Sequence, residues 1–170
     1  MNLGNLVRIA HAFDASFFFS VAPHLKLSDA NSDTSRAHGA LPFYSFERPE
    51  DFRLPLGCRL VGVEITDEAI ELPSFRHPRQ AAYILGAERE GLSAEIQSRC
   101  DYVVKIPTAF SVNLGVAGAL IMYDRLLVMG RHAPRPVAEG APTEATPLPL
   151  FGDPVYKRKQ RARQRAQAKT

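Results

Sequence analysis

Short apolar runs, each bounded by turn-forming residues, recur along the first 130 residues of the chain. Three of them, at 59–65, 81–85 and 102–106, lack the alternation of apolar and polar residues that is typical of a strand with one solvent-exposed face. Continuous apolar strands of this kind are typical of a parallel sheet covered on both faces. Because stretches with helical spacing lie between them, the sequence predicts an α/β fold with a parallel sheet. A ligand is then expected beyond the carboxyl ends of the strands.

The stretches around these runs predict helices, a further strand and a loop. Residues 4–13 place apolar side chains at helical spacing, and an aromatic-rich run at 15–21 predicts a buried strand. Ser93 is a suitable N-cap for a short helix that ends at residue 99. Residues 113–129 predict a longer helix that is apolar around most of its circumference, so we expect it to be well buried. Residues 28–39 are polar and predict a loop or a weak helix.

The composition fits one soluble globular body followed by a non-globular segment. Of the 170 residues, 45% are hydrophobic and 23% are charged, and no apolar run reaches the ~18 residues that a membrane span needs. Cys58 and Cys100 are too few for a disulfide framework and are expected to be small buried hydrophobes. The five histidines are too scattered to predict a metal site. Since no signal peptide is visible, these features predict a reduced, cytoplasmic protein.

Charge is unevenly distributed along the chain. Seven basic residues and one acid fall within 153–170, which leaves 14 basic and 17 acidic side chains in residues 1–152. Six prolines lie between residues 131 and 154, a composition that cannot bury enough apolar surface to fold. We therefore expect a domain over 1–130, a Pro-rich linker over 131–154 and a basic tail over 155–170. The tail is expected to bind a polyanion, nucleic acid first, with a purely solubilising end as the alternative.

Three segments combine residue types that suit a binding site, and the first lies at 2–8. Asparagines and Gly4 stand at the start of a helix, where free N–H groups and the helix dipole favour an anion. Arg8 follows one turn later, and its planar cation with five donors suits a phosphate. Taken alone, this segment is better explained by ordinary N-capping by Asn2 or Asn5 beside a solvated Arg8.

The second segment, at 84–93, has Gly86 and Gly91 at the carboxyl end of a predicted strand. Glycines at such a place let the backbone approach a ligand closely. The segment is not a P-loop, because no Gly-Lys-Ser/Thr follows. Glu88, which lies between the two glycines, is either a charged clamp or a solvated carboxylate.

The third segment, at 106–119, runs from the end of a strand through Pro107 into a helix that opens with Ser111 and Asn113. Capping of the helix by one of these two side chains is the simplest explanation for them. Small residues also fill 115–119. They indicate that something packs tightly against that face of the helix.

Taken together and in this order, the three segments resemble the motifs of the SpoU/TrmH-like branch of the SPOUT superfamily of RNA methyltransferases. Motif one of that branch reads N-x-G-N-x-x-R, motif two reads G-x-E-x-x-G-L-S, and motif three joins Ile-Pro to S-x-N at the start of the last helix. The matching residues are Asn2, Gly4, Asn5 and Arg8, then Gly86, Glu88, Gly91, Leu92 and Ser93, and finally Ile106, Pro107, Ser111 and Asn113. Each motif is weak alone, but their order and spacing over residues 2–130 make a specific signal.

The resemblance implies a parallel sheet followed by a trefoil knot, a homodimer, and S-adenosylmethionine bound by the loops of the knot. An apolar slot with nearly bare backbone would hold the adenine. The cofactor-binding residues implied in this way are Leu85, Gly86, Gly91, Ile106, Pro107, Leu114 and Ala117.

The reaction implied by the resemblance is methyl transfer to a ribose 2′-hydroxyl of tRNA or rRNA. Arg8 would engage the phosphate of the acceptor nucleotide and assist the hydroxyl, acting at the cofactor of the partner subunit. Asn5, Glu88, Ser111 and Asn113 would orient Arg8, the target ribose and the knot loops. Glu88 would do so by pairing with the Arg8 guanidinium.

The chain also departs from the branch. Only one residue precedes motif one, where members have a first strand, so we expect a truncated chain, a misassigned start or a sheet that lacks this strand. Asp14 stands where the branch has glycine, which predicts strain in that turn. Outside the motifs, Glu64, Asp67 and Glu68 follow a predicted strand and either contact the cofactor's ribose or form a solvated loop.

Two other functions remain open at this point. The same scaffold could serve as a non-catalytic RNA-binding or assembly protein, which the basic tail and the absent first strand favour. A methyltransferase acting on a base nitrogen is disfavoured, because motif three carries no aspartate suited to deprotonating a base. Binding of S-adenosylmethionine separates the enzyme from the non-catalytic alternative.

Overall fold

A computed structural model describes residues 2–22, 41–87 and 90–130, together with a few single residues beyond them. The chain divides into two units, residues 1–128 and residues 129–170, and everything below concerns the first. The predicted polar segment 28–39 and the basic tail 155–170 lie outside the described residues, as does most of the predicted linker 131–154. Glu88 also lies outside them.

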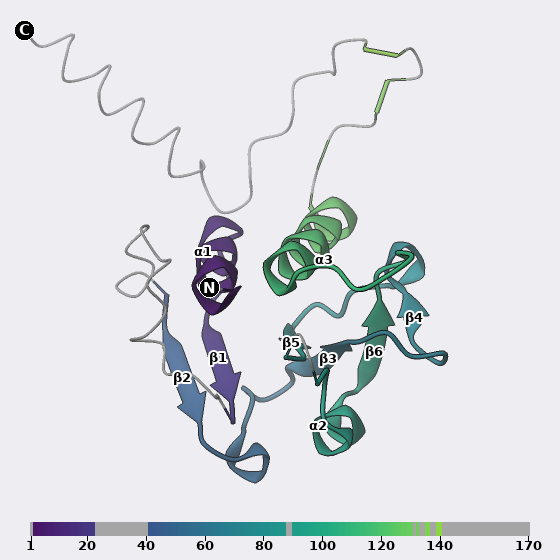
Figure 1. Cartoon of the computed structure of the whole chain (residues 1–170). Helices are drawn as coiled ribbons and strands as arrows, with labels where there is room; N and C mark the ends of the chain where they lie inside the picture. Colours follow the sequence, from purple (N-terminus) through teal and green to yellow (C-terminus); the bar gives the residue numbers. More distant parts are fainter. Residues whose placement is uncertain are drawn as a thin grey trace, which may run out of the picture. The chain divides into compact units, whose positions relative to one another are not determined.

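The described part of the chain contains both α-helices and β-strands (Figure 1). The helices are α1 (Asn2–Ala12), α2 (Ala94–Arg99) and α3 (Leu114–Met129), with short 3₁₀ helices at Pro49–Asp51 and Leu72–Ser74. The strands are β1 (Phe18–Val21), β2 (Phe43–Phe46), β3 (Arg59–Val63), β4 (Ile70–Glu71), β5 (Ala81–Leu85) and β6 (Tyr102–Lys105).

The strands form two parallel sheets, a four-stranded one in the order β4-β6-β3-β5 and a two-stranded one of β1 and β2. The parallel α/β architecture predicted from the apolar runs is therefore confirmed, and those runs are β3, β5 and β6. Strands β2 and β4 were not predicted. With β1 and β2 in a sheet of their own, β5 is an edge strand of the larger sheet.

The four-stranded sheet is covered on both faces (Figure 1). Successive residues of a strand point to opposite faces, so Leu60 packs with Ile84 and with Ile96 of α2 on one side. Its neighbour Val61 packs with Ile121 of α3 on the other side. The sheet is the middle layer between α2 and α3, which explains why its strands are apolar on both faces.

Helix α1 packs against two partners. Its buried Val7 and Ala10 contact Phe18 of β1, in a small core over the two-stranded sheet. On another side, α1 approaches the first turns of α3 so closely that a Cβ added to Gly118 would overlap Leu6. The tight packing predicted from the small residues of 115–119 is confirmed, and the packing partner is α1.

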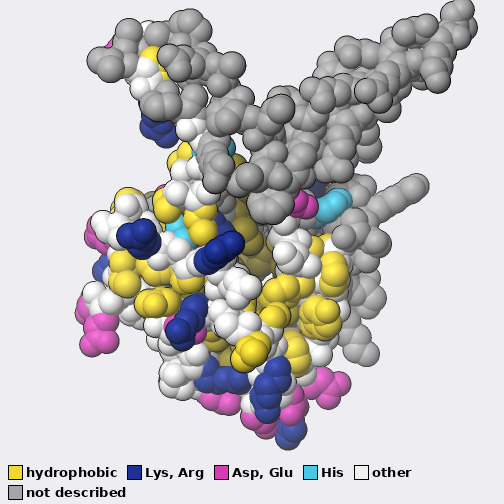
Figure 2. Space-filling view, turned by 180° about the vertical axis from the view of Figure 1, so that it is seen from behind, with side chains coloured by type: hydrophobic (Ala, Val, Ile, Leu, Met, Phe, Trp, Pro, Cys, Tyr) yellow, Lys and Arg dark blue, Asp and Glu magenta, His cyan; other side chains and the backbone are white. Residues whose placement is uncertain are grey.

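The prediction that 113–129 would be well buried is wrong for most of its larger side chains. The buried residues of α3 are Gly115, Ala117, Gly118 and Ile121, so the closest contacts fall on small residues. Large apolar side chains remain exposed at Val116 (49%), Leu120 (38%), Tyr123 (50%) and Leu127 (39%), which we call the α3 stripe. When a helix is apolar around its whole circumference, its sequence does not show which face packs against the rest of the chain. Figure 2 shows hydrophobic side chains at the surface of the body.

A buried polar cluster ties the second half of α3 to β5. The His77 side chain is fully buried, with Nε2 2.9 Å from an Asp124 carboxylate oxygen and Nδ1 2.6 Å from the Tyr83 hydroxyl. Arg125 donates to the same hydroxyl at 3.1 Å and to the Pro78 carbonyl at 2.7 Å. Burial raises the pKa of Tyr83, and the nearby Arg125 partly offsets this rise. The hydroxyl therefore stays protonated at neutral pH and can donate to His77.

The turn after α1 is strained, as predicted from Asp14. Its φ is 58°, in the left-handed region that costs an L-residue about 1–2 kcal/mol. We expect D14G to be more stable than D14A by about 1 kcal/mol in urea unfolding, because glycine adopts this conformation freely. Glu68, an exposed residue outside the left-handed region, is the control: E68G should be less stable than E68A. The same order of stability at both positions would contradict the assignment of strain to Asp14.

Candidate functional site

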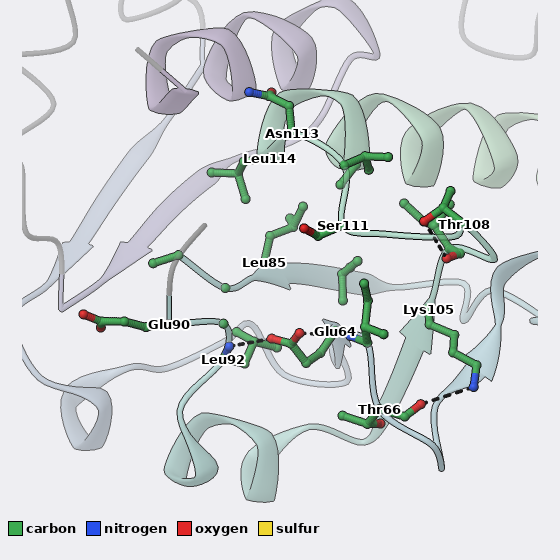
Figure 3. A pocket seen from close by; sticks show the side chains of 18 of the residues that line it. Glu64, Thr66, Leu85, Glu90, Leu92, Lys105, Thr108, Ser111, Asn113 and Leu114 are labelled. Atoms are coloured by element: carbon green, nitrogen blue, oxygen red, sulfur yellow. Dashed lines mark hydrogen bonds between the residues drawn. The ribbon is translucent and has the colours of Figure 1, made fainter.

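A cavity of about 660 Å³ opens at the carboxyl ends of the central strands (Figure 3). The residues that follow these strands line it: Glu64 after β3, Gly86 after β5 and Ile106 after β6. Leu114, the first residue of α3, lines it from the opposite side. This is the edge of the sheet at which the alternation of strands and helices predicted a ligand.

Two glycines shape the cavity wall after β5. Gly91 has a φ of +66° and donates its N–H to the Ala87 carbonyl at 2.8 Å, which closes the turn. A Cβ added to Gly86 would overlap the backbone of Gly91 and Leu92. Only glycine fits at Gly86, which as a lining residue presents main-chain atoms to the cavity.

Glu64 braces this turn from the central strand (Figure 3). One of its carboxylate oxygens accepts the Leu92 N–H at 2.6 Å, and the other accepts the Ile65 N–H at 2.9 Å. A Cβ on Gly91 would lie 2.5 Å from the first oxygen. The half-buried carboxylate is thus fixed inside the cavity wall. The prediction left open whether Glu64, Asp67 and Glu68 contact the cofactor's ribose or form a solvated loop. Asp67 and Glu68 are exposed and do not line the cavity, whereas Glu64 does.

The remaining wall is apolar near α3 and polar near β6. Leu85, Leu114 and Ala117 contribute apolar surface. Lys105 donates from Nζ to the carbonyls of Thr66 at 3.2 Å and Asp67 at 3.4 Å, so its charge is held at the rim by main-chain oxygens. The cavity therefore combines an apolar slot with a few oriented polar groups, as small-molecule sites do.

Most of the predicted site residues lie together in this cavity. Those that line it are Leu85, Gly86, Gly91, Ile106, Ser111, Asn113, Leu114 and Ala117. Pro107, predicted to bind the cofactor, is exposed and does not line it. Its neighbour Ile106 turns inward instead.

Asn5 and Arg8 lie elsewhere, in a smaller groove of about 240 Å³ between α1 and α3. Asn113 lines both the groove and the cavity, so the two sites adjoin at the start of α3. Its side-chain oxygen accepts the Gly115 N–H at 2.9 Å, which caps the helix as the simpler explanation predicted. Arg8 itself is exposed and does not line the cavity of its own chain.

Motif reasoning missed the polar lining residues that match no fixed position of a motif. They include Thr66, Glu90, Gln97, Lys105 and Thr108. The position of Thr66 and Thr108 just after β3 and β6 was an available signal, because parallel strands end at a common edge. Gln97 lies on α2 and donates to the Leu92 carbonyl at 2.7 Å, a contact that sequence spacing does not reveal.

Other chemistries find less support in the part of the chain that the structure describes. Both cysteines are free, and burial raises the pKa of the Cys58 and Cys100 thiols, so neither is activated as a nucleophile. Across the described ranges, no group of three or more His, Cys, Asp or Glu side chains is placed to hold a metal ion. No helix in these ranges is long and apolar enough to cross a membrane.

The fold and the cavity define a parallel α/β protein with a cavity at the carboxyl edge of its sheet. The chain matches the SpoU rRNA Methylase family over residues 1–123, and it belongs to that family.

Individual relatives agree with this assignment. An uncharacterized tRNA/rRNA methyltransferase of Archaeoglobus fulgidus is 29% identical over 132 residues, which are 72% of this chain and 57% of that protein. The mouse tRNA (guanosine(18)-2′-O)-methyltransferase TARBP1 is 35% identical over 71 residues, or 40% of this chain and 4% of that protein. The chain thus spans little more than half of the first relative and a small part of the second.

A solved structure gives the same fold. The SpoU methyltransferase AviRb from Streptomyces viridochromogenes, in complex with the cofactor AdoMet, superposes with a TM-score of 0.65 and is 26% identical. The match covers 76% of this chain and 54% of that chain.

The packing at Gly86 makes a stability prediction. G86A should lower the free energy of unfolding by about 1–3 kcal/mol, because the added methyl group meets backbone rather than a movable side chain. G115A is the matched control, since its Cβ would lie 3.2 Å from the Asn113 side-chain oxygen and alanine favours a helix. Urea unfolding that ranks G86A as stable as G115A would contradict the described turn.

Proposed function

We propose that this chain is an S-adenosylmethionine-dependent RNA methyltransferase that acts on a ribose 2′-hydroxyl of tRNA or rRNA. Membership of the SpoU family, the AdoMet bound to AviRb and the 2′-O specificity in the name of the mouse relative support this proposal. The observation that carries it is the cavity at the carboxyl edge of the sheet, which brings motifs two and three together.

The residues of the cavity fit the cofactor. Its volume of about 660 Å³ is in the range of small-molecule sites, roughly 300–1,000 Å³. Leu85, Ile106 and Leu114 would contact the adenine with apolar surface, while the glycines of the turn would offer main-chain groups. Pro107, next to Ile106, would fix the course of this loop, which we propose belongs to a trefoil knot. When bound, S-adenosylmethionine supplies a methyl group on a positively charged sulfur, which is already electrophilic.

Because the methyl donor is electrophilic, the protein's task is to position the acceptor. We assign to Arg8 the binding of the acceptor nucleotide's phosphate, for which a planar guanidinium is well suited. Correct positioning of the reactants alone can lower the activation barrier by up to roughly 7–11 kcal/mol. Ser111 and Asn113 would orient the ribose from the cavity side, and Asn5 would do so from the groove. Glu88, which lies in motif two, would hold the Arg8 guanidinium.

Arg8 does not line the cavity of its own chain, so we propose that it acts at the cavity of a partner subunit in a homodimer. The α3 stripe supports this assembly, because exposed apolar side chains at helical spacing are typical of an interface. The stripe continues from the groove that holds Arg8, since Val116 belongs to both. The basic tail would add affinity for the RNA backbone.

The central test is binding and activity of the wild-type protein and R8A. Calorimetry should show saturable binding of S-adenosylmethionine to both proteins. Mass-spectrometric mapping of ribose methylation in total RNA should show that R8A transfers methyl groups about 100-fold or more less than the wild type, because the acceptor is misplaced. R76A, which removes another exposed arginine, should match the wild type.

Two results would contradict the proposal. Full transfer activity in R8A would remove the role of Arg8 while leaving the fold assignment intact. A wild-type protein with no saturable S-adenosylmethionine binding would instead support the non-catalytic RNA-binding protein.

The homodimer makes a separate prediction. L120E should shift the protein from dimer to monomer in sedimentation equilibrium, because an interface that buries an unpaired carboxylate loses stability. L56E changes a fully exposed leucine outside the stripe and should leave the dimer intact. A wild-type protein that sediments as a monomer would overturn the proposed assembly.

A further inference from the structure

Glu64 occupies a central place at the ligand edge of the sheet. It directly follows β3, the strand that pairs with β5 on one side and with β6 on the other. Its carboxylate therefore enters the cavity wall between the two loops that carry motifs two and three. Glu64 belongs to no motif, and the proposed reaction assigns it no role.

The carboxylate is held in one orientation. Its two oxygens accept the N–H groups of Leu92 and Ile65 at 2.6 and 2.9 Å, and Gly91 leaves room for it where any side chain would collide. A carboxylate has about four acceptor positions, so these two bonds leave acceptor capacity on each oxygen. A rigid acceptor in a cavity wall is already oriented for a ligand, and it loses little entropy on binding.

Lys105, at the end of the neighbouring strand β6, does not occupy these free acceptor positions of Glu64. The Lys105 ammonium group donates to the carbonyls of Thr66 and Asp67 instead. The remaining acceptors of Glu64 suit a ligand that brings hydroxyl donors. A ribose carries two adjacent hydroxyl groups, and an acid near the end of a parallel strand commonly binds them in nucleotide-binding α/β folds.

We infer that Glu64 binds the ribose hydroxyls of the nucleoside cofactor. The inference rests on the proposed function, because that function supplies a nucleoside as the ligand. It assigns to one residue both the bracing of the glycine turn and the recognition of the ribose.

The test compares ligands that differ in a single hydroxyl group. Calorimetry would measure the affinities of S-adenosylhomocysteine and of its 2′-deoxy and 3′-deoxy forms for the full chain. We expect the wild type to bind at least one deoxy form about tenfold more weakly, because a hydrogen bond to a charged acceptor is lost. In E64Q this ratio should fall toward one. E68Q, a change of an exposed acid outside the cavity, should keep the wild-type ratio.

The outcomes separate a ligand contact from a purely structural role. If Glu64 only braces the turn, E64Q will weaken all three ligands equally and the ratio will stay at its wild-type value, which overturns the inference. Equal affinities of the wild type for all three ligands overturn it as well. If the wild type binds neither S-adenosylhomocysteine nor S-adenosylmethionine, the proposed function itself fails. Should E64Q not fold, E64D provides the same comparison, because it withdraws the carboxylate by one methylene group, and an unchanged ratio there overturns the inference.

Discussion

The close approach of α1 to the first turns of α3 determines where the functional groups lie. Gly115 and Gly118 have no side chains to hold the helices apart, so Leu6 and Ile9 of α1 lie directly on α3. This contact places the groove with Arg8 beside the cavity at the carboxyl edge of the sheet. A side chain at Gly118 would overlap Leu6, so that Leu6 or α1 would have to shift.

Much of the larger sheet could be predicted from the sequence. The runs that form β3, β5 and β6 are apolar on both faces and end at breakers, and the covering helices α2 and α3 explain why. Strands β2 and β4 were not predicted because they are short and largely exposed. β4 has only two residues and β2 only four, with two of its side chains exposed, so neither leaves a continuous apolar run. The exposure of the α3 stripe could not be predicted either, because hydrophobic periodicity does not show which face of a helix packs against the rest of the chain.

The candidate site was predictable where backbone geometry constrains the residue type. Gly86 and Gly91 are required by the tight turn, and this requirement is what makes the motif readable in the sequence. Side chains that act through long-range contacts were not predictable in the same way. Nothing in the local sequence shows that Glu64 meets the N–H of Leu92, or that Arg8 opens onto a groove separate from the cavity.

The division of the strands into two sheets has a mechanical consequence. Arg8 belongs to α1, which packs on β1, whereas the cavity belongs to the four-stranded sheet. In the described part of the chain, no strand pairing links β1 to β5, and the two parts meet through side chains such as Phe19, whose ring stacks on Phe52 at 4.9 Å. Side-chain contacts can slide by small amounts where a hydrogen-bonded ladder cannot. In the part of the chain that the structure describes, α1 is therefore joined to the four-stranded sheet by side-chain packing and not by a shared backbone ladder.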